Sequence, residues 1–406
     1  MKRLVVFCLC IAIALTSFVG YCGKAADAAE VVELSLWHYM GEVEGEIMRK
    51  YVGMFNEAHP GIRVTDTYVT REDLLRQYTM GALAGNLPDI SMVDNPDHAS
   101  FSAMGVFEDV TEYVEAWGQK DMFFEGPLMS TIYESRIYGL PFNSNCLALF
   151  YNKDMLDAAG IAVPTTWEEL EAACEALTQG DVYGLAMSAI NNEEGTFQFM
   201  PWFISADGSI DDLGGAGPIK AISYLNNFIE KGYMSRDVMG WTQADANQQF
   251  MNEKAAMQVN GPWQVPNINR DAPDLNWGVA LIPRDVKYAS VLGGENFAIG
   301  AGADVQAAFT FLSWFCSREN LAEYCFESGK FPPRSDSMTL KEFWTVDPVF
   351  SVFGSALQYA MPRGPHPRWP EISNAMSTAM HEVFMGVRSA EDAMKAAAAK
   401  YSELVQ

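Results

Sequence analysis

The stretch Tyr138–Asp154, YGLPFNSNCLALFYNKD, places three small polar residues inside an otherwise apolar run. A turn marked by Pro141 precedes them, and a strand-like apolar segment follows. A polar bend within a buried strand is where a chain that crosses between two lobes can flex, while its side chains reach a ligand. The stretch therefore predicts a hinge on the floor of a cleft. The residues of this predicted hinge are Asn143, Ser144 and Asn145.

The rest of the chain supports two lobes. Its 406 residues exceed the size that one hydrophobic core usually supports. Between residues 31 and 94, strand-like runs alternate with amphipathic helical runs. A second such region follows the opening stretch, where segment 165–179 begins with a capping-box pattern from Thr166 to Glu169. The pattern predicts an α/β protein in which each lobe is a sheet flanked by helices, the first sheet being parallel.

Polar and aromatic residues follow three predicted strands of the first region. They are Trp37 and His38, then Tyr68, then Asp94 and Asn95. Open parallel sheets bind ligands beyond the carboxyl ends of their strands, so these side chains are expected to converge on one edge of the cleft. Structural roles are the alternative for single residues: Trp37 in the core, and Asp94 as the cap of the next helix.

The N-terminus predicts export. Lys2 and Arg3 precede an apolar run, and small residues end at Ala28, the pattern of a secretory signal peptide spanning residues 1–28. The expected location is the periplasm or the extracellular face of the membrane. Cys22 offers an alternative, a lipid anchor, although Tyr21 departs from the small residue that a lipidation motif places before its cysteine.

Charge and cysteine content narrow the choice of partners. A formal net charge of −25 disfavours binding to nucleic acid or to anionic membranes. The cysteines that follow residue 28 show no CxxC spacing and no neighbouring histidine pattern, so neither a metal nor another cofactor is expected. They are Cys146, Cys174, Cys316 and Cys325. The last two either pair or remain buried free thiols.

Several strings, taken in their order along the chain, resemble one known family. They include LPDISMVD, YGLPFNSNCLALFYNKDMLDAAGIAVPTTWEEL, FMNEKAAMQVNGPWQV, LGGENFAIG and SGKFPPRSD. The chain is similar to extracellular (periplasmic) solute-binding proteins of ABC importers, family 1, in the maltose-binding-type branch. The resemblance implies a two-lobe periplasmic-binding-protein fold that closes on a solute in the interlobe cleft and delivers it to a membrane permease. It implies a binder rather than an enzyme, with no catalytic residue, and a monomer is expected.

The resemblance also implies three chain crossings between the lobes, and these set the predicted boundaries. The crossings are expected near Phe142–Asn145, Val279–Ile282 and Phe331–Ser335. The N-terminal lobe is then predicted to comprise residues 29–142 and 283–333. The C-terminal lobe is predicted to comprise residues 143–282 and 334–406.

Because the branch mostly binds sugars, two kinds of side chain are expected in the cleft. Aromatic rings stack on the C–H face of a pyranose, and planar polar groups bracket its hydroxyls. Trp37, Trp263 and Trp369 stand beside turns and are the stacking candidates. The polar candidates are His38, Tyr68, Asp94, Asn95, Asn143, Ser144, Asn145, Glu295 and Asn296, with Arg334, Arg363 and Arg368. Gly293 and Gly294 can bring backbone amides close to a ligand, as the matching glycines of the family do.

Two other functions stay open. Glycerol-3-phosphate or a related phosphodiester is the alternative solute, since LWHYMGEVEGE resembles a string of that subfamily and arginines bind phosphate in a bidentate manner. Trp263 favours a sugar ring instead, because that subfamily has small residues there. A secreted glycosidase is the alternative of another class, with Asp94 and Glu295 as the carboxylate pair that hydrolysis requires. No hydrolase motif supports it.

Overall fold

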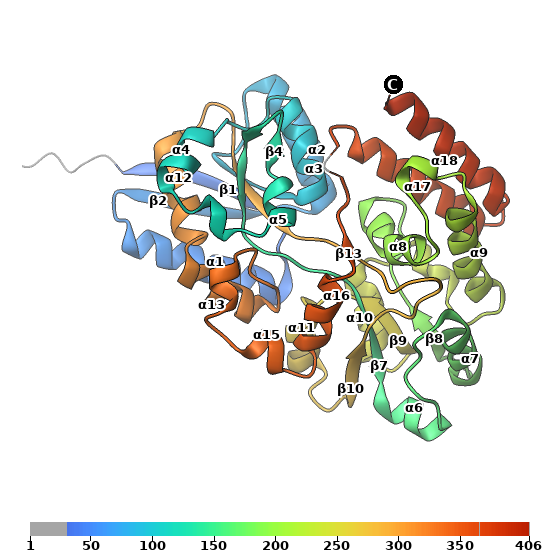
Figure 1. Ribbon diagram of the computed structural model, residues 1–406. Helices are drawn as coiled ribbons and strands as arrows, with labels where there is room; N and C mark the ends of the chain where they lie inside the picture. The colour runs from blue at the N-terminus through green and yellow to red at the C-terminus, as the bar shows by residue number, and fades with distance from the viewer. Residues whose placement is uncertain (1–30, 365, 406) are drawn as a thin grey trace, which may run out of the picture.

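The computed structural model describes residues 31–364 and 366–405. The predicted signal peptide, with Cys22 and the cleavage site after Ala28, lies outside the described residues. Figure 1 shows two α/β lobes side by side, joined by several strand segments that run between them.

The elements follow in chain order. Up to residue 141 they are β1 (Val32–His38), α1 (Glu42–Ala58), β2 (Ile62–Tyr68), α2 (Arg71–Ala84), β3 (Ile90–Asp94), α3 (Asn95–Ala103), α4 (Thr111–Trp117), η1 (Lys120–Met122), α5 (Glu125–Met129), β4 (Ile132–Tyr133), β5 (Arg136–Ile137) and β6 (Gly139–Pro141). From 148 to 280 they are β7 (Ala148–Asn152), α6 (Lys153–Ala159), α7 (Trp167–Leu177), β8 (Tyr183–Ala186), α8 (Glu193–Ser205), η2 (Ile210–Asp212), α9 (Ala216–Glu230), η3 (Arg236–Met239), α10 (Gln243–Met251), β9 (Ala255–Asn260), α11 (Gln264–Asp271) and β10 (Trp277–Ala280). The last are β11 (Ser290–Val291), β12 (Glu295–Ile299), α12 (Val305–Phe315), α13 (Arg318–Ser328), α14 (Ser335–Met338), α15 (Phe343–Val346), α16 (Phe350–Leu357), β13 (Ala360–Met361), α17 (Trp369–Phe384) and α18 (Ala390–Leu404).

Each lobe is built on one sheet. The first has five strands in the order β2-β1-β3-β12-β6, and the second has four in the order β10-β7-β9-β8. Strands β1, β2 and β3 are parallel, as the alternation predicted, but β12 runs antiparallel to both β3 and β6. The antiparallel strand brings Glu295 into register with Asp94, at the edge where the parallel strands end.

Two hydrophobic cores stabilise the protein. The first runs from the first sheet onto one face of the second sheet, where it includes Phe150 and Val279, and the second core covers the opposite face of the second sheet. In the first lobe, α1 buries Ile47, Tyr51 and Phe55, which recur every four residues along one helical face. In the second lobe, α17 packs against α8 and α18 against α9, so the C-terminal helices extend that core (Figure 1). Helix α7 begins at the predicted cap, where the Glu169 backbone N–H donates to Thr166 Oγ1 at 3.2 Å. All four described cysteines, including Cys316 and Cys325, are buried free thiols.

The polar bend of the opening stretch lies where the chain passes between the sheets. Ser144 and Phe331 exchange two backbone hydrogen bonds of 2.8 and 2.9 Å. Asn145 and Gly293 exchange another two, of 3.0 and 2.9 Å. Segments that are far apart in sequence therefore run side by side at this bend.

The second crossing lies later than the predicted Val279–Ile282. Strand β10 pairs with β7 in the second sheet, and the loop after it stays with the second lobe, where the Trp167 backbone N–H donates to the Arg284 carbonyl at 3.0 Å. The chain reaches the first sheet only after Gly293, at β12. The predicted boundary at 282/283 thus precedes this crossing by about ten residues, because β-strand pairing keeps residues 283–291 with the second lobe.

Candidate functional site

A cavity of about 580 Å³ lies between the two sheets and draws its walls from both lobes. The first lobe contributes the β1–α1 turn, the start of α2 and the ends of β3 and β12. The second contributes the starts of α8, α10 and α11. Loop residues Lys330 and Arg363 complete the lining.

Aromatic side chains form part of this wall. Tyr39, Tyr68, Phe197 and Trp263 line the cavity, and the rings of Phe197 and Trp263 are 6.3 Å apart at 33°. Gly261 fixes the place of the indole, because a Cβ at that position would lie 1.9 Å from the Trp263 ring. A ring held against its own backbone in this way is a rigid surface for stacking.

Amide side chains from both sides line the same cavity. Asn145 and Asn267 are 4% and 6% exposed, and in each the Oδ1 atom has no hydrogen-bond partner among the described residues. Asn267 Nδ2 donates to Gln264 Oε1 at 3.1 Å, which orients that amide. Close packing also favours glycine at position 293, because a Cβ there would lie 2.2 Å from Asn145 Oδ1. Buried acceptors without donors are expected where a ligand supplies the missing partner.

A buried charge in the cleft, the Arg363 guanidinium, joins the two lobes. Its Nη1 and Nη2 donate to the two oxygens of Asp94 at 3.0 and 2.8 Å, and Nη1 also donates to Glu193 Oε1 at 2.6 Å. Asp94 ends β3 of the first lobe, and Glu193 begins α8 of the second. The Arg363 guanidinium carbon also lies 4.3 Å from the centre of the Phe197 ring, a cation–π contact.

Two further cations in the cavity are also paired. Arg71 donates to Asp97 at 2.5 Å and to Asp94 at 3.2 Å. Burial raises the pKa of Asp97 to about 7, although Arg71 opposes the shift. Lys330 Nζ lies 2.8 Å from Glu44 and 3.1 Å from Glu295. Burial alone would lower the pKa of Lys330, but the carboxylates of Glu295 and Glu44 outweigh it and raise the pKa.

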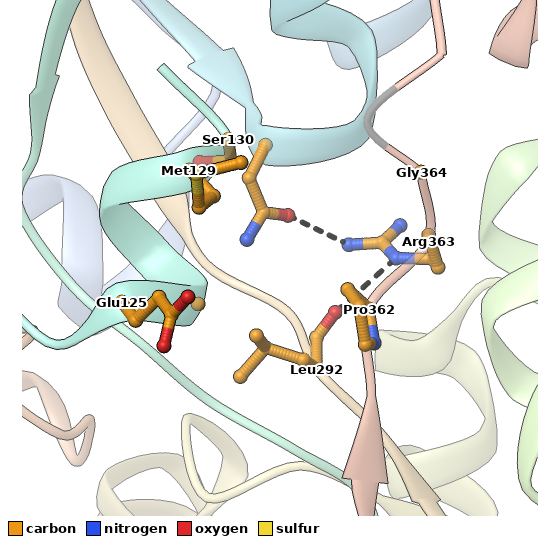
Figure 2. Close-up of a pocket in the computed structure, with 9 residues that line it drawn as sticks. Glu125, Met129, Ser130, Leu292, Pro362, Arg363 and Gly364 are labelled. Carbon is orange, nitrogen blue, oxygen red and sulfur yellow. Dashed lines mark hydrogen bonds between the residues drawn. The ribbon is translucent and has the colours of Figure 1, made fainter. Parts of the chain in front are cut away.

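A second cavity, of about 390 Å³, adjoins the first across Arg363. Figure 2 shows Glu125 and Met129 of α5 with the following Ser130 on one side, and Leu292 and the loop Pro362–Gly364 on the other. The Arg363 side chain donates here to Asn95 Oδ1 at 3.3 Å and to the Leu292 carbonyl at 3.4 Å. The guanidinium is therefore a shared wall between the two cavities.

Eight of the predicted site residues line one of these cavities. The larger cavity includes Tyr68, Asp94, Asn145, Trp263, Gly294, Glu295 and Arg363, and the smaller one includes Asn95. Sequence reasoning missed Arg71, Glu193 and Lys330, which pair with predicted charges, and Glu44, which pairs with Lys330. Lys330 had a local signal, since it stands in the quoted string SGKFPPRSD next to Gly329. The others begin or precede helices and look like ordinary first-turn residues.

The remaining predicted residues lie outside both cavities, and three of them are aromatic side chains that contact other groups of the protein. Trp37 stacks on Tyr78 at 6.4 Å. His38 is fully buried beside Asp66. Trp369 is buried in the second core, and its indole N–H donates to Glu193 Oε2 at 3.0 Å, so the ring packs against protein and offers no stacking face.

The polar residues outside the cavities have structural partners as well. Asn143, Ser144 and Gly293 are buried at the crossing, the last two through backbone pairing. Asn296 follows the cavity residue Glu295, so it points to the opposite face of β12, where it contacts His98 and Ser130. Arg334 is buried against Asp336, Gln119 and the Cys316 carbonyl. Arg368 pairs at the surface with Glu371.

Within the described residues, no group of three or more histidine, cysteine or acidic side chains is arranged to hold a metal ion. Nor does any helix in the described ranges have the length and apolar character needed to span a bilayer.

Two α/β lobes joined by crossing segments, with an aromatic and polar cavity between them, define a two-lobe ligand-binding protein. The chain belongs to the bacterial extracellular solute-binding protein family, whose sequence model matches residues 50–351. The predicted family and fold class are thereby confirmed.

Individual relatives cover most of the chain. The maltotriose-binding protein of Pyrococcus abyssi is 25% identical over 392 residues, which span 91% of this chain and 80% of that protein. The sn-glycerol-3-phosphate-binding periplasmic protein of Escherichia coli is 25% identical over 340 residues, covering 76% and 75% of the two chains. A solved ABC transporter solute-binding protein of Thermotoga lettingae, bound with alpha-D-tagatose, is 25% identical, has a TM-score of 0.86, and matches 92% of this chain and 100% of its own.

Proposed function

We propose that this protein binds a mono- or oligosaccharide in the interlobe cavity and delivers it to the permease of an ABC importer. The observation that carries the proposal is the pairing of a rigid indole, Trp263, with the partnerless amide oxygens of Asn145 and Asn267 in one cavity. A sugar ring offers an apolar face for the indole and hydroxyl donors for the amides. The relatives that bind maltotriose and tagatose support the same solute class.

Binding is proposed to act through closure of the lobes. Contacts that a solute makes with both walls favour the closed arrangement, and only contacts absent from the open arrangement shift the population. The crossing segments at Asn145, Gly293 and Phe331 would serve as the hinge. We retain the division into two lobes as part of the proposal, with the second boundary moved to the crossing beside Gly293.

Location and assembly complete the proposal. A secretory signal peptide cleaved after Ala28 would place the protein outside the cytoplasmic membrane, as the family description also implies. Lipid attachment at Cys22 remains the alternative. The protein would act as a monomer and without catalysis, since the family consists of binders.

The phosphodiester alternative fits the cavity less well. A phosphate needs cationic donors that are free to bind it. Arg71, Lys330 and Arg363 are the three cations that line the larger cavity, and carboxylates hold all of them. The same contacts disfavour a glycosidase, because Asp94 and Glu295 each form a salt bridge with a cation.

The test is a thermal-shift screen of the mature chain against monosaccharides, malto-oligosaccharides and glycerol-3-phosphate, followed by calorimetry. A ligand at a hundred times its dissociation constant should stabilise the protein by roughly 2.7 kcal/mol. Trp263→Ala should then weaken sugar binding about tenfold, because a stacked ring contributes about 1 to 1.5 kcal/mol. Its unfolding midpoint should stay close to that of the wild type. A shift with glycerol-3-phosphate alone would reject the sugar assignment.

A further inference from the structure

The larger cavity carries a strong excess of negative charge. Seven carboxylate side chains line it against three cations, a formal excess of four negative charges. The acids are Glu42, Glu44, Glu72, Asp94, Glu193, Glu194 and Glu295. Glu125, which lines the adjoining cavity, adds another. An anionic solute would therefore meet repulsion from the wall together with cations that are already paired.

Two of these acidic residues, one from each lobe, contact the same asparagine, Glu72 through its carboxylate and Glu194 through its backbone N–H. Asn192 Nδ2 donates to Glu72 Oε1 at 2.7 Å, and Asn192 Oδ1 accepts from the Glu194 backbone N–H at 2.9 Å. Glu72 lies in the first turn of α2, and Glu194 in the first turn of α8. Glu194 also accepts a hydrogen bond from the Gln243 backbone N–H. Among the described residues, no salt bridge reaches Glu72 or Glu194.

The nearest cation in sequence does not neutralise this pair. The Arg71 guanidinium is held by Asp94 and Asp97. Elsewhere in the cavity, most buried amide atoms without a partner among the described residues are acceptors, the Oδ1 atoms of Asn145 and Asn267, and one is a donor, Gln243 Nε2. The cavity thus offers carboxylate and amide oxygens to its ligand, and the complementary solute is rich in donors.

We propose that the solute is a sugar that carries a protonated amine, and that its ammonium group binds between Glu72 and Glu194. An ammonium ion brings three donors and one positive charge, which suits two carboxylates without a cation. Since the two acids come from different lobes, the same contact would favour closure. This inference rests on the proposed sugar-binding function and narrows its substrate class.

The experiment compares matched sugars on the mature chain by calorimetry in low salt. The first set is D-glucose, D-glucosamine and D-glucuronate, and the second is the corresponding galactose series. The third compares cello-oligosaccharides with fully deacetylated chitosan oligomers. At least one amine should bind about tenfold or more tightly than its neutral parent, the scale of a charge-assisted hydrogen bond. The uronates should show no binding. The preference should shrink in 0.5 M NaCl, because salt screens charge.

Two conservative variants locate the effect. Glu194→Gln and Glu72→Gln keep a side-chain acceptor for their present donors but remove the charge. Each should reduce the affinity for the amine severalfold and lower the ratio of amine affinity to neutral-parent affinity toward one. Glu175→Gln, an exposed position on α7 with no salt bridge among the described residues, is the matched control and should change neither.

The outcomes separate the two proposals. If a neutral sugar binds as tightly as its amine, or a uronate binds, the charge inference is overturned while sugar binding stands. If spermidine binds and no sugar does, or if no member of the panel binds, both proposals fail. An amine preference that survives in both glutamine variants would overturn the assigned position.

Discussion

Removing the Arg363 guanidinium tests whether the ion network between the lobes is structural. Arg363→Met keeps an unbranched apolar stem against Phe197 but deletes the donors to Asp94 and Glu193. The side chains of Asp94 and Glu193 are 12% and 8% exposed, so neither carboxylate regains full hydration. Taking one partner from a buried ion pair costs about 3 to 5 kcal/mol, because an uncompensated charge stays behind. We expect a loss of that size in the free energy of unfolding, measured by urea titration.

The same loop provides a matched control for this variant. Arg368 is about half exposed and pairs with Glu371 three residues later, a contact that contributes about 0.5 kcal/mol or less. Arg368→Met should therefore be nearly neutral. A triple variant, Arg363→Met with Asp94→Asn and Glu193→Gln, removes these three charges while Arg71 keeps its salt bridge with Asp97, and it should regain most of the lost stability.

Two results would refute this reasoning. The first is an Arg363→Met protein no less stable than Arg368→Met, which would mean that water already reaches the network. The second is a triple variant less stable than the single one, which would mean that the hydrogen bonds of Asp94 and Glu193 outweigh the cost of their unpaired charge. Small-angle scattering of the solute-free proteins complements both measurements, since a relaxed network should increase the radius of gyration.

Three further predictions address close packing, pH and local capping. Gly293→Ala should lower stability by about 1 to 3 kcal/mol and weaken solute binding by calorimetry, because its Cβ would lie 2.2 Å from Asn145 Oδ1; unchanged affinity would remove Asn145 from the site. The pKa of Asp97, about 7 in the folded protein against 3.8 in its unperturbed state, means that the folded state holds this proton more tightly, so its contribution to stability is full below about pH 4 and is lost as the pH rises through 7. Asp97→Asn should accordingly gain stability relative to the wild type between pH 5 and pH 8 in urea titrations, and a constant difference would contradict the shift. Thr166→Ala should cost about 1 kcal/mol through the lost cap of α7 and leave solute affinity unchanged, whereas altered affinity would show that this helix is coupled to the cleft.

Features with local causes were readable from the sequence. Strands β1 to β3 were predicted because hydrophobic alternation and turn residues act within a few positions. The polar bend at Asn143–Asn145 was predicted as a crossing because it breaks an apolar run, and it lies where backbone pairs join separate segments. Trp263 was predicted as a cleft residue from the preceding glycine and proline, and it lines the cavity. Whether it contacts solute is still a prediction.

Features that depend on tertiary pairing were not readable. Trp369 stands beside a turn like Trp263, yet it begins α17 and packs into the core beside Glu193. Arg334 looks like Arg363 in a proline-containing loop, but its partners are Asp336 and Gln119 in the body of the protein. No periodicity distinguishes the two cases, because the difference lies in which segment comes opposite after folding. The second crossing was predicted directly after β10, earlier than the crossing beside Gly293, because strand pairing after folding also decides where the chain changes lobe.

Contacts that the protein makes between its own lobes limit what a solute can change. Arg363 joins Asp94 and Glu193 across the lobes through protein side chains alone, so this network contributes to the equilibrium between open and closed arrangements. A solute shifts that equilibrium only through contacts that differ between the two arrangements. Trp263, the amide oxygens of Asn145 and Asn267, which have no partner among the described residues, and the acids Glu72 and Glu194 are groups that can make such contacts. Variants of the network should therefore change the shape of the free protein, whereas variants at Trp263 should change only the response to solute.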